Sequence, residues 1–124
     1  MNLLKISAVI VLLGITILSL MPPRSGMNIE VNDKIGHFIA YCVLMVNIGL
    51  FTPSKKYLYA LIFVVGYSAV MEYFQGFVPG RMVSWADVMA NFTGACIGLL
   101  VLFSFKKSIL KLLQGLKLIK LKAD

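Results

Sequence analysis

The sequence has few charged residues and few of the residues from which catalytic and metal-binding motifs are built. Only 14% of its 124 residues are charged, five of these are Asp or Glu, and there are one histidine and two cysteines. Cys42 and Cys96 lie inside apolar segments without a Cys-x-x-Cys pair, so a disulfide framework is not expected. The lone histidine lacks an H-E-x-x-H or similar spacing, and no Ser-His-Asp or Cys-His set stands out. We therefore expect no metal and no cofactor.

Apolar residues are in large excess. Hydrophobic residues make up 60% of the chain and the mean hydropathy is +0.90, which gives more apolar surface than one small soluble core can bury. The net charge of +7 comes from residues at segment ends and in the tail, where they suit anionic lipid headgroups better than nucleic acid. The composition predicts a membrane protein with no nucleic-acid partner.

Four apolar runs predict transmembrane helices at residues 6–21, 35–51, 57–74 and 85–105. Each approaches the roughly 20 residues that a helix needs to cross the hydrocarbon. The first run follows Lys5 as in a signal peptide, but Ser19-Leu20-Met21 before two prolines is a poor cleavage site, so we expect this helix to be retained. The sequence thus predicts an all-α bundle of four transmembrane helices, forming one domain over residues 1–105.

Lysine and arginine are distributed unevenly between the two ends of these helices. One end has three, Arg24, Lys34 and Arg81, and the other has nine, Lys5, Lys55, Lys56, Lys106, Lys107, Lys111, Lys117, Lys120 and Lys122. Positive residues near helix ends favour the cytoplasmic side, so both termini are expected inside (N-in/C-in) in a multi-pass protein of the cell inner, cytoplasmic, membrane. In residues 106–124 the lysines alternate with Ile and Leu, which predicts a basic amphipathic C-terminal helix along the inner leaflet.

Polar residues collect at the outer ends of the expected helices. The second helix opens with Asp33, Lys34 and His37, the third closes with Glu72 and Gln75, the next loop holds Arg81, and the fourth opens with Ser84, Asp87 and Asn91. The pairs Asp33/His37 and Asp87/Asn91 are four residues apart and share a helix face. Small residues at Ala90, Gly94 and Gly98 predict close packing of the fourth helix, with Asp87 and Asn91 pointing into the bundle. Because unpaired ionisable groups are costly in a membrane, this set is a candidate functional site.

Several of these residues also have a purely structural interpretation. Ser84 and Asp87 fit a capping box at the start of the fourth helix, and Asn32 or Asp33 fits an N-cap of the second. Arg81 can serve only to pair with lipid phosphate. Glu72 is harder to explain, because a carboxylate in the last turn of a helix opposes the helix dipole. It needs a partner, and Arg81 or His37 is the obvious choice.

Taken in order, these motifs resemble the VanZ-like family of small membrane proteins. They are Ser19-Leu20-Met21-Pro22, the segment from Asp33 to Tyr41 (D-K-x-x-H-F-x-A-Y), Glu72-Tyr73-Phe74-Gln75, Pro79-Gly80-Arg81, and Asp87 with Ala90-Asn91 and Gly94. The resemblance covers nearly the whole chain apart from the lysine-rich tail. The family's namesake is associated with low-level resistance to the glycopeptide teicoplanin. The resemblance therefore implies a role at the outer membrane surface but no particular reaction.

Two classes of function follow from this combination. In the first, His37, Glu72 and Asp87 supply acid–base groups, and a headgroup is bound by Asp33, Lys34, Gln75, Arg81 and Asn91. The partner would be a lipid-linked cell-envelope precursor or glycolipid headgroup among the membrane lipids. In the second, the protein is a non-catalytic structural or accessory component whose polar cluster only fastens the helices. A transporter is less favoured, because the polar groups are confined to one leaflet.

Overall fold

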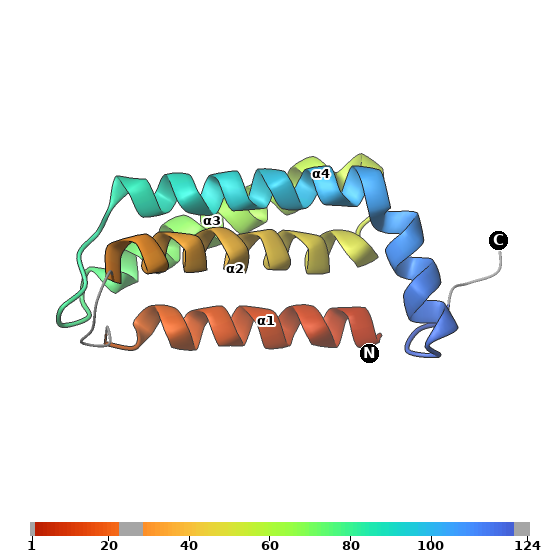
Figure 1. Ribbon diagram of the computed structural model, residues 1–124, viewed down its shortest axis with the longest axis horizontal. Helices are drawn as coiled ribbons and strands as arrows, with labels where there is room; N and C mark the ends of the chain where they lie inside the picture. The colour runs from red at the N-terminus through yellow and green to blue at the C-terminus, as the bar shows by residue number, and fades with distance from the viewer. Residues whose placement is uncertain (1, 23–28, 121–124) are drawn as a thin grey trace.

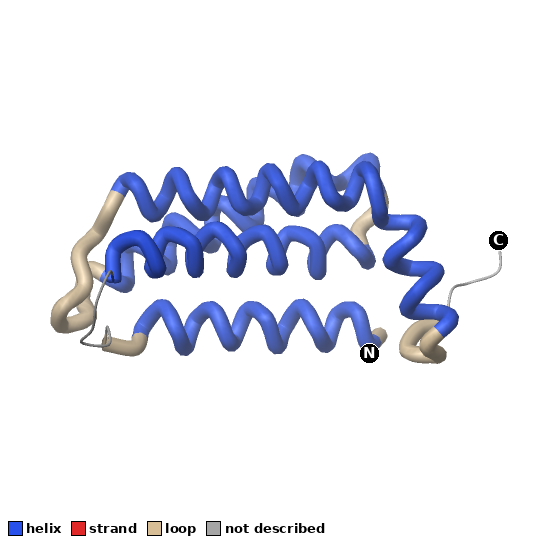
Figure 2. The backbone as a smooth tube through the Cα atoms, viewed as in Figure 1, coloured by secondary structure: helices blue, strands red, loops and turns tan. Residues whose placement is uncertain are grey.

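Four long helices make up the protein (Figure 1). The computed structural model describes residues 2–22 and 29–120, and in these it contains α1 (Leu3–Leu20), α2 (Ile29–Phe51), the single turn η1 (Ser54–Lys56), α3 (Tyr57–Gln75) and α4 (Trp85–Gly115). Figure 2 shows only helices and loops in the described part of the chain. The all-α fold with four helices, predicted from the apolar runs, is confirmed.

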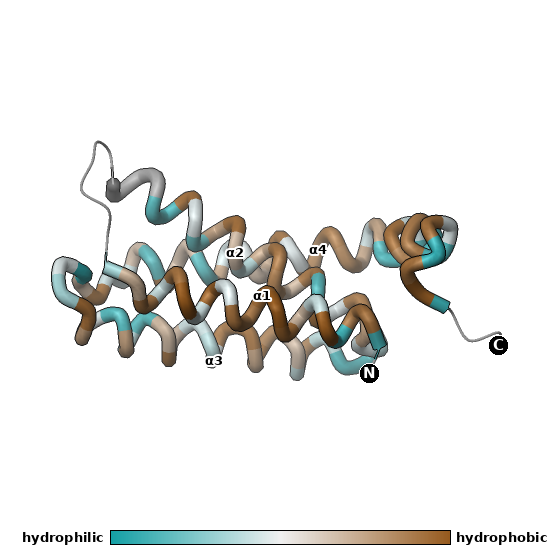
Figure 3. Tube along the Cα trace, turned by 90° about the horizontal axis from the view of Figure 1, so that it is seen from below, coloured by the Kyte–Doolittle hydropathy of each residue, from teal (hydrophilic) through white to brown (hydrophobic). Residues whose placement is uncertain are grey.

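The outer faces of the helices are apolar. Ile10 and Leu13 of α1, Ile62 of α3 and Leu100 of α4 are all exposed, and Figure 3 shows hydrophobic residues along the length of the bundle. Each of the four helices is long and apolar enough to cross a membrane. An apolar exterior of this extent is unfavourable in water and matches the hydrocarbon of a bilayer. The chain is therefore a multi-pass membrane protein.

The closest helix packing is between α2 and α4, and small residues permit it. A Cβ atom added at Gly94 would collide with the backbone carbonyl of Phe38, and one added at Gly98 would lie 2.7 Å from the carbonyl oxygen of Cys42. Only glycine allows the two backbones to approach this closely. The small-residue stripe predicted on the fourth helix is thus the surface that fixes α4 against α2.

The helices alternate in direction, so the bundle has two distinct ends. At one end, here called the loop end, α1 and α3 finish and α2 and α4 begin; at the other, here called the tail end, α1 and α3 begin (Figure 1). At the loop end α2 starts at Ile29, several residues before the predicted start. Asn32 and Asp33 are therefore inside the helix, and the prediction that either is its N-cap was wrong. The apolar pattern marked only the part of α2 that suits the hydrocarbon, whereas the helix continues into the polar region.

The first part of the basic C-terminal segment is helical, as expected, but it is continuous with the fourth helix. α4 runs on to Gly115, and its last part bends at the tail end of the bundle (Figure 1). Ile109, Leu110 and Leu113 pack against the core, and Ile119 is buried in it. Lys106 Nζ donates hydrogen bonds to the carbonyls of Gly49 (2.9 Å) and Thr52 (2.6 Å) at the end of α2. Part of the predicted apolar stripe therefore faces the protein, while Lys122 lies outside the described residues.

Candidate functional site

Two pairs of polar side chains meet at the loop end. Asp33 and His37 are one turn apart on α2, and Asp87 and Asn91 are one turn apart on α4. Because these two helices pack most closely, the pairs are held opposite each other. Asp87 and Asn91 are only 6% and 2% exposed. The predicted inward orientation of both side chains is confirmed.

The His37 ring is held by Asn91 and faces two carboxylates. Its Nδ1 lies 2.9 Å from Asn91 Oδ1, and since an amide oxygen only accepts, Nδ1 is the donor. On the other side of the ring, Nε2 lies 3.6 Å from Asp33 Oδ2 and 3.9 Å from Asp87 Oδ2. Both distances exceed the range of an N–H···O hydrogen bond. The ring is therefore oriented by one amide while its second nitrogen faces a pair of acidic groups.

A tight turn places Arg81. The Arg81 backbone N–H donates to the Val78 carbonyl at 3.1 Å, and Gly80, between them, has a φ of 81°. Proline at the second position and a glycine of positive φ at the third are characteristic of a type II turn. The Pro79-Gly80-Arg81 motif thus forms a turn that directs the Arg81 side chain back over the bundle.

The Arg81 guanidinium caps α1 and joins it to α2. Nε donates to the Met21 carbonyl at 2.8 Å, Nη2 donates to the Leu18 carbonyl at 3.3 Å, and Nη1 lies 3.5 Å from Asp33 Oδ1. The last carbonyls of a helix lack intrahelical partners. A cation there also interacts favourably with the negative end of the helix dipole. The expected pairing of Glu72 with Arg81 was wrong, because the loop carries the arginine over the end of α1.

Glu72 has a different partner from the one expected. Its Oε1 accepts a hydrogen bond from the backbone N–H of Ser84 at 2.9 Å, and Ser84 is the N-cap of α4 but makes no capping bond with its side chain. In a capping box this N–H is satisfied from within the same helix by the third residue, which here is Asp87. Glu72 of α3 takes that role instead, so the predicted Ser84/Asp87 capping box was wrong.

This exchange frees Asp87 to face His37. Among the described residues the Asp87 carboxylate has no hydrogen-bond donor, and His37 Nε2 lies 3.9 Å from its Oδ2. The second oxygen of Glu72, Oε2, is fully buried without a hydrogen-bond partner in the described part of the chain. Buried acceptors left in this way are uncommon and often mark a functional site.

A pocket of about 330 Å³ lies beside this cluster. Its polar lining comes from Asp33, His37, Gln75 and Arg81, and its apolar lining includes Ile15, Leu18 and Ala40. The sequence interpretation assigned no site residue to α1, although the Ser19-Leu20-Met21-Pro22 motif marks its loop end. In the structure the backbone carbonyl of Ser19 accepts a hydrogen bond from Gln75 Nε2 at 3.2 Å.

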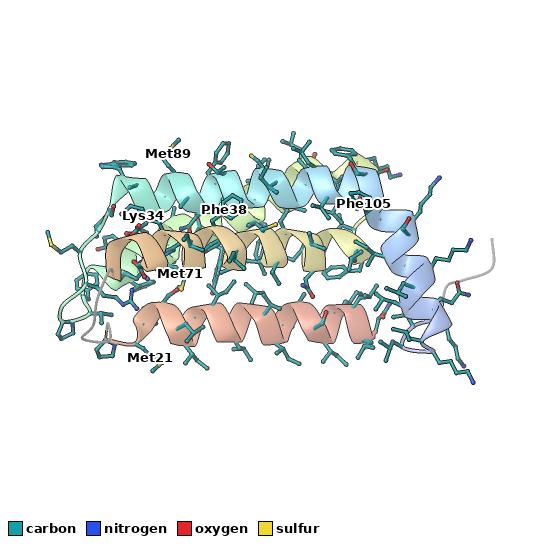
Figure 4. All side chains as sticks on the ribbon, viewed as in Figure 1. Met21, Lys34, Phe38, Met71, Met89 and Phe105 are labelled. Carbon is teal, nitrogen blue, oxygen red and sulfur yellow. The ribbon has the colours of Figure 1, made fainter. Side chains whose placement is uncertain are left out.

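The structure places the sequence-predicted site residues unequally. Asp33, His37, Asp87 and Asn91 form one cluster, with Arg81 attached through Asp33. Glu72 and Gln75 are buried at the same end but are tied to Ser84 and Ser19 respectively. Lys34 lies at the loop end, where Figure 4 labels it, and makes no ion pair or hydrogen bond with the described residues. Arg24, the other outer charge in the sequence analysis, is outside the described residues.

Comparison with known proteins adds one match. No curated protein and no solved structure matches the chain. The profile of the VanZ/LLP1 family matches residues 5–107, which include most of α1, the starts of the other three helices and every residue of the cluster. Together with four helices that can cross a membrane and the order of motifs at the loop end, this match shows that the chain belongs to the VanZ/LLP1 family.

Proposed function

We propose that this protein recognises the anionic headgroup of a lipid-linked cell-envelope component from the extracytoplasmic side of the cytoplasmic membrane. The observation that carries the proposal is the pocket of about 330 Å³, in which charged and amide groups meet apolar side chains of α1 and α2. Small-molecule sites are typically concave, largely apolar and furnished with a few polar groups. A lipid headgroup together with the first carbons of its chain likewise combines a polar part with an apolar part.

The pocket residues support headgroup binding in distinct ways. Guanidinium groups bind phosphate through paired N–H donors, and Arg81 lines the pocket while it caps α1. Gln75 offers an amide, and His37 offers an imidazole held in one orientation by Asn91. His37 lines the pocket and is the candidate for proton transfer to a bound headgroup. Asp87 faces the His37 ring from outside the pocket lining, and Glu72 is a weaker candidate because it is also outside the lining and Ser84 occupies one of its oxygens. We propose recognition and assign no reaction.

The distribution of charge supports the proposed side of the membrane. Lys5, Lys55 and Lys56 lie at the tail end with the lysines of the last part of α4, whereas Lys34 and Arg81 are the described basic residues of the loop end. Because positive residues favour the cytoplasmic side, this distribution supports a cytoplasmic tail end and a pocket that opens outside. In this orientation a link to resistance against teicoplanin-type glycopeptides would act through a lipid-linked precursor.

One observation favours the alternative of a fastening function. Three Arg81 nitrogens are already directed to Met21, Leu18 and Asp33, so this residue holds α1, α2 and the loop together without any ligand. In that case the cluster maintains the bundle, and the protein acts as an accessory component of the membrane.

Glycine substitutions separate the two functions. Gly36 lines the pocket, and a Cβ atom there would meet nothing within 4 Å; Gly66 has equally free surroundings but does not line it. Gly36→Leu should fill the pocket without breaking a contact, and Gly66→Leu is the matched control. Native mass spectrometry of the purified full chain with a polyprenyl phosphate should show adducts for the wild type and Gly66→Leu, and loss for Gly36→Leu.

The same variants can be compared by glycopeptide susceptibility of the host. If Gly36→Leu binds the polyprenyl phosphate as the wild type does, headgroup recognition in this pocket is refuted. If Arg81→Lys then loses stability and phenotype in proportion, the fastening function is supported, since one lysine nitrogen cannot replace three arginine contacts.

A further inference from the structure

We infer that Asp33, His37 and Asp87 form a binding site for one divalent transition-metal ion of the zinc type. One carboxylate oxygen from each aspartate and one imidazole nitrogen lie within 4.8 Å of one another. Carboxylate and imidazole are ligands that zinc accepts in proteins. The inference does not depend on headgroup recognition, and it departs from the sequence analysis, which found no zinc motif because the ligands are divided between two helices.

The distances favour a bridging ion over direct hydrogen bonds. Nε2 of His37 is 3.6 Å from Asp33 Oδ2 and 3.9 Å from Asp87 Oδ2, and both separations are too long for a proton shared between the atoms. Zinc bonds of about 2.0–2.1 Å in a tetrahedral arrangement place ligand atoms about 3.3–3.4 Å apart. Zinc binding would therefore shorten these separations by about 0.3 Å for Asp33 and about 0.5 Å for Asp87, and would draw together the two carboxylate oxygens, which lie within 4.8 Å of each other.

Asn91 supplies a second, independent indication. Metal-ligating histidines usually donate their other ring N–H to an oxygen that fixes the tautomer. His37 does this, since Nδ1 donates to Asn91 Oδ1 at 2.9 Å and Asn91 is only 2% exposed. In the neutral ring Nε2 then carries a lone pair directed toward two carboxylates. Three electron-rich atoms gathered in this way repel one another unless a cation lies between them.

The buried Asp87 carboxylate points to the same occupant. Asp87 is 6% exposed, and none of the described residues donates a hydrogen bond to its side chain. A buried carboxylate without a hydrogen-bond donor is expensive, even in the first turn of a helix, where the dipole favours a negative charge. A divalent ion would balance the charges of Asp33 and Asp87 together, while Arg81 binds only the other oxygen of Asp33, Oδ1.

The site also has an entry path and room for a further ligand. The Asp33 side chain is 36% exposed, and both Asp33 and His37 line the 330 Å³ pocket. Three protein ligands with a fourth position facing a pocket are the arrangement of a zinc site that binds an exogenous ligand, such as water or a phosphate oxygen.

The test is metal binding by the full chain, purified in detergent with any histidine tag removed. After treatment with a chelator, the protein is titrated with Zn²⁺ by calorimetry, its bound metal is counted by mass spectrometry, and Co²⁺ is used to record the visible absorption of a coordinated ion. We expect one ion per chain for the wild type. Asp33→Asn and Asp87→Asn should each weaken Zn²⁺ binding by more than about 100-fold, beyond the range of an outer-shell change.

Two asparagines provide the controls. Asn91→Leu should weaken Zn²⁺ binding by about 10–100-fold, and Asn91→Asp should restore it because a carboxylate also orients the ring. Asn47→Leu makes the same amide-to-leucine change in α2 away from the set, where Asn47 Oδ1 accepts a hydrogen bond from Ser7 Oγ at 2.7 Å, and should bind as the wild type does. Absence of Zn²⁺ and Co²⁺ binding by the wild type, or equal binding by Asp33→Asn and the wild type, would overturn the inference. Because Asp33 is partly exposed, its variant remains informative even if Asp87→Asn does not fold.

Discussion

Glu72 offers the sharpest test of how the loop end is held together. Its Oε1 accepts the Ser84 N–H at 2.9 Å across 12 residues, whereas its Oε2 is buried without a partner in the described part of the chain. Glu72→Gln keeps the shape and the accepting oxygen, and Glu72→Ala removes both. The hydroxyl of Ser84 makes no capping bond, so Ser84→Ala tests whether the N-terminus of α4 is capped by its own residue or by α3.

The magnitudes separate these variants. A hydrogen bond to a charged group contributes about 1.5–3 kcal/mol, and the methylene lost in Glu72→Ala contributes about 0.8 kcal/mol. Glu72→Ala also removes the buried unpaired oxygen, which stabilises the protein and offsets part of these two losses, so the free energy of unfolding should fall by about 2 kcal/mol. In Glu72→Gln the hydrogen bond becomes weaker because the acceptor is neutral, but the cost of burying a charge is also removed. These two effects have opposite signs, so the net change should stay within about 1 kcal/mol. Ser84→Ala should cost less than the typical ~1 kcal/mol of a lost N-cap.

The measurement is thermal and denaturant unfolding of the purified protein in one detergent, with polyprenyl phosphate binding measured on the same samples. A loss of about 2 kcal/mol corresponds to a fall in the unfolding midpoint of several degrees, roughly 5–10 °C for a chain of this size. Equal losses for Glu72→Gln and Glu72→Ala would show that the charge itself fastens the bundle. A larger loss for Ser84→Ala than for Glu72→Ala would refute capping of α4 by α3.

Two further predictions concern packing and topology. Gly94→Ala should lower the free energy of unfolding by about 1–3 kcal/mol, the usual cost of overpacking, because its Cβ atom would collide with the Phe38 carbonyl. Gly66→Ala is the control: its Cβ atom would meet nothing within 4 Å, so the change should be neutral or stabilising. The unfolding midpoint of both variants measures this, and equal behaviour would contradict the close α2–α4 contact. In a background without native cysteines, Phe77→Cys should react with an impermeant thiol reagent added outside cells and Ser54→Cys should not; the reverse pattern would place the pocket in the cytoplasm.

The sequence alone was sufficient for the membrane-spanning architecture. Apolar runs interrupted near Pro22, at residues 52–56 and at residues 76–84 mark four helices, because hydrophobic length and helix period are local properties of the chain. The same local rules placed Asp33 with His37 and Asp87 with Asn91, and the Gly94 stripe identified the closely packed face of α4. These predictions needed only residues a few positions apart, and each agrees with the structure.

The partner of each polar side chain was decided only by the tertiary structure. Arg81 caps α1, Glu72 binds the backbone of Ser84, and Asp87 is thereby left facing His37, whereas the sequence suggested ion pairs among them. These contacts join residues that are between 12 and 63 positions apart. They depend on the path of a nine-residue loop, from Gly76 to Ser84, and on the depth to which two glycines let α4 approach α2. Local periodicity fixes the face on which a side chain lies, but only the packing of one helix against another fixes which atom it meets there.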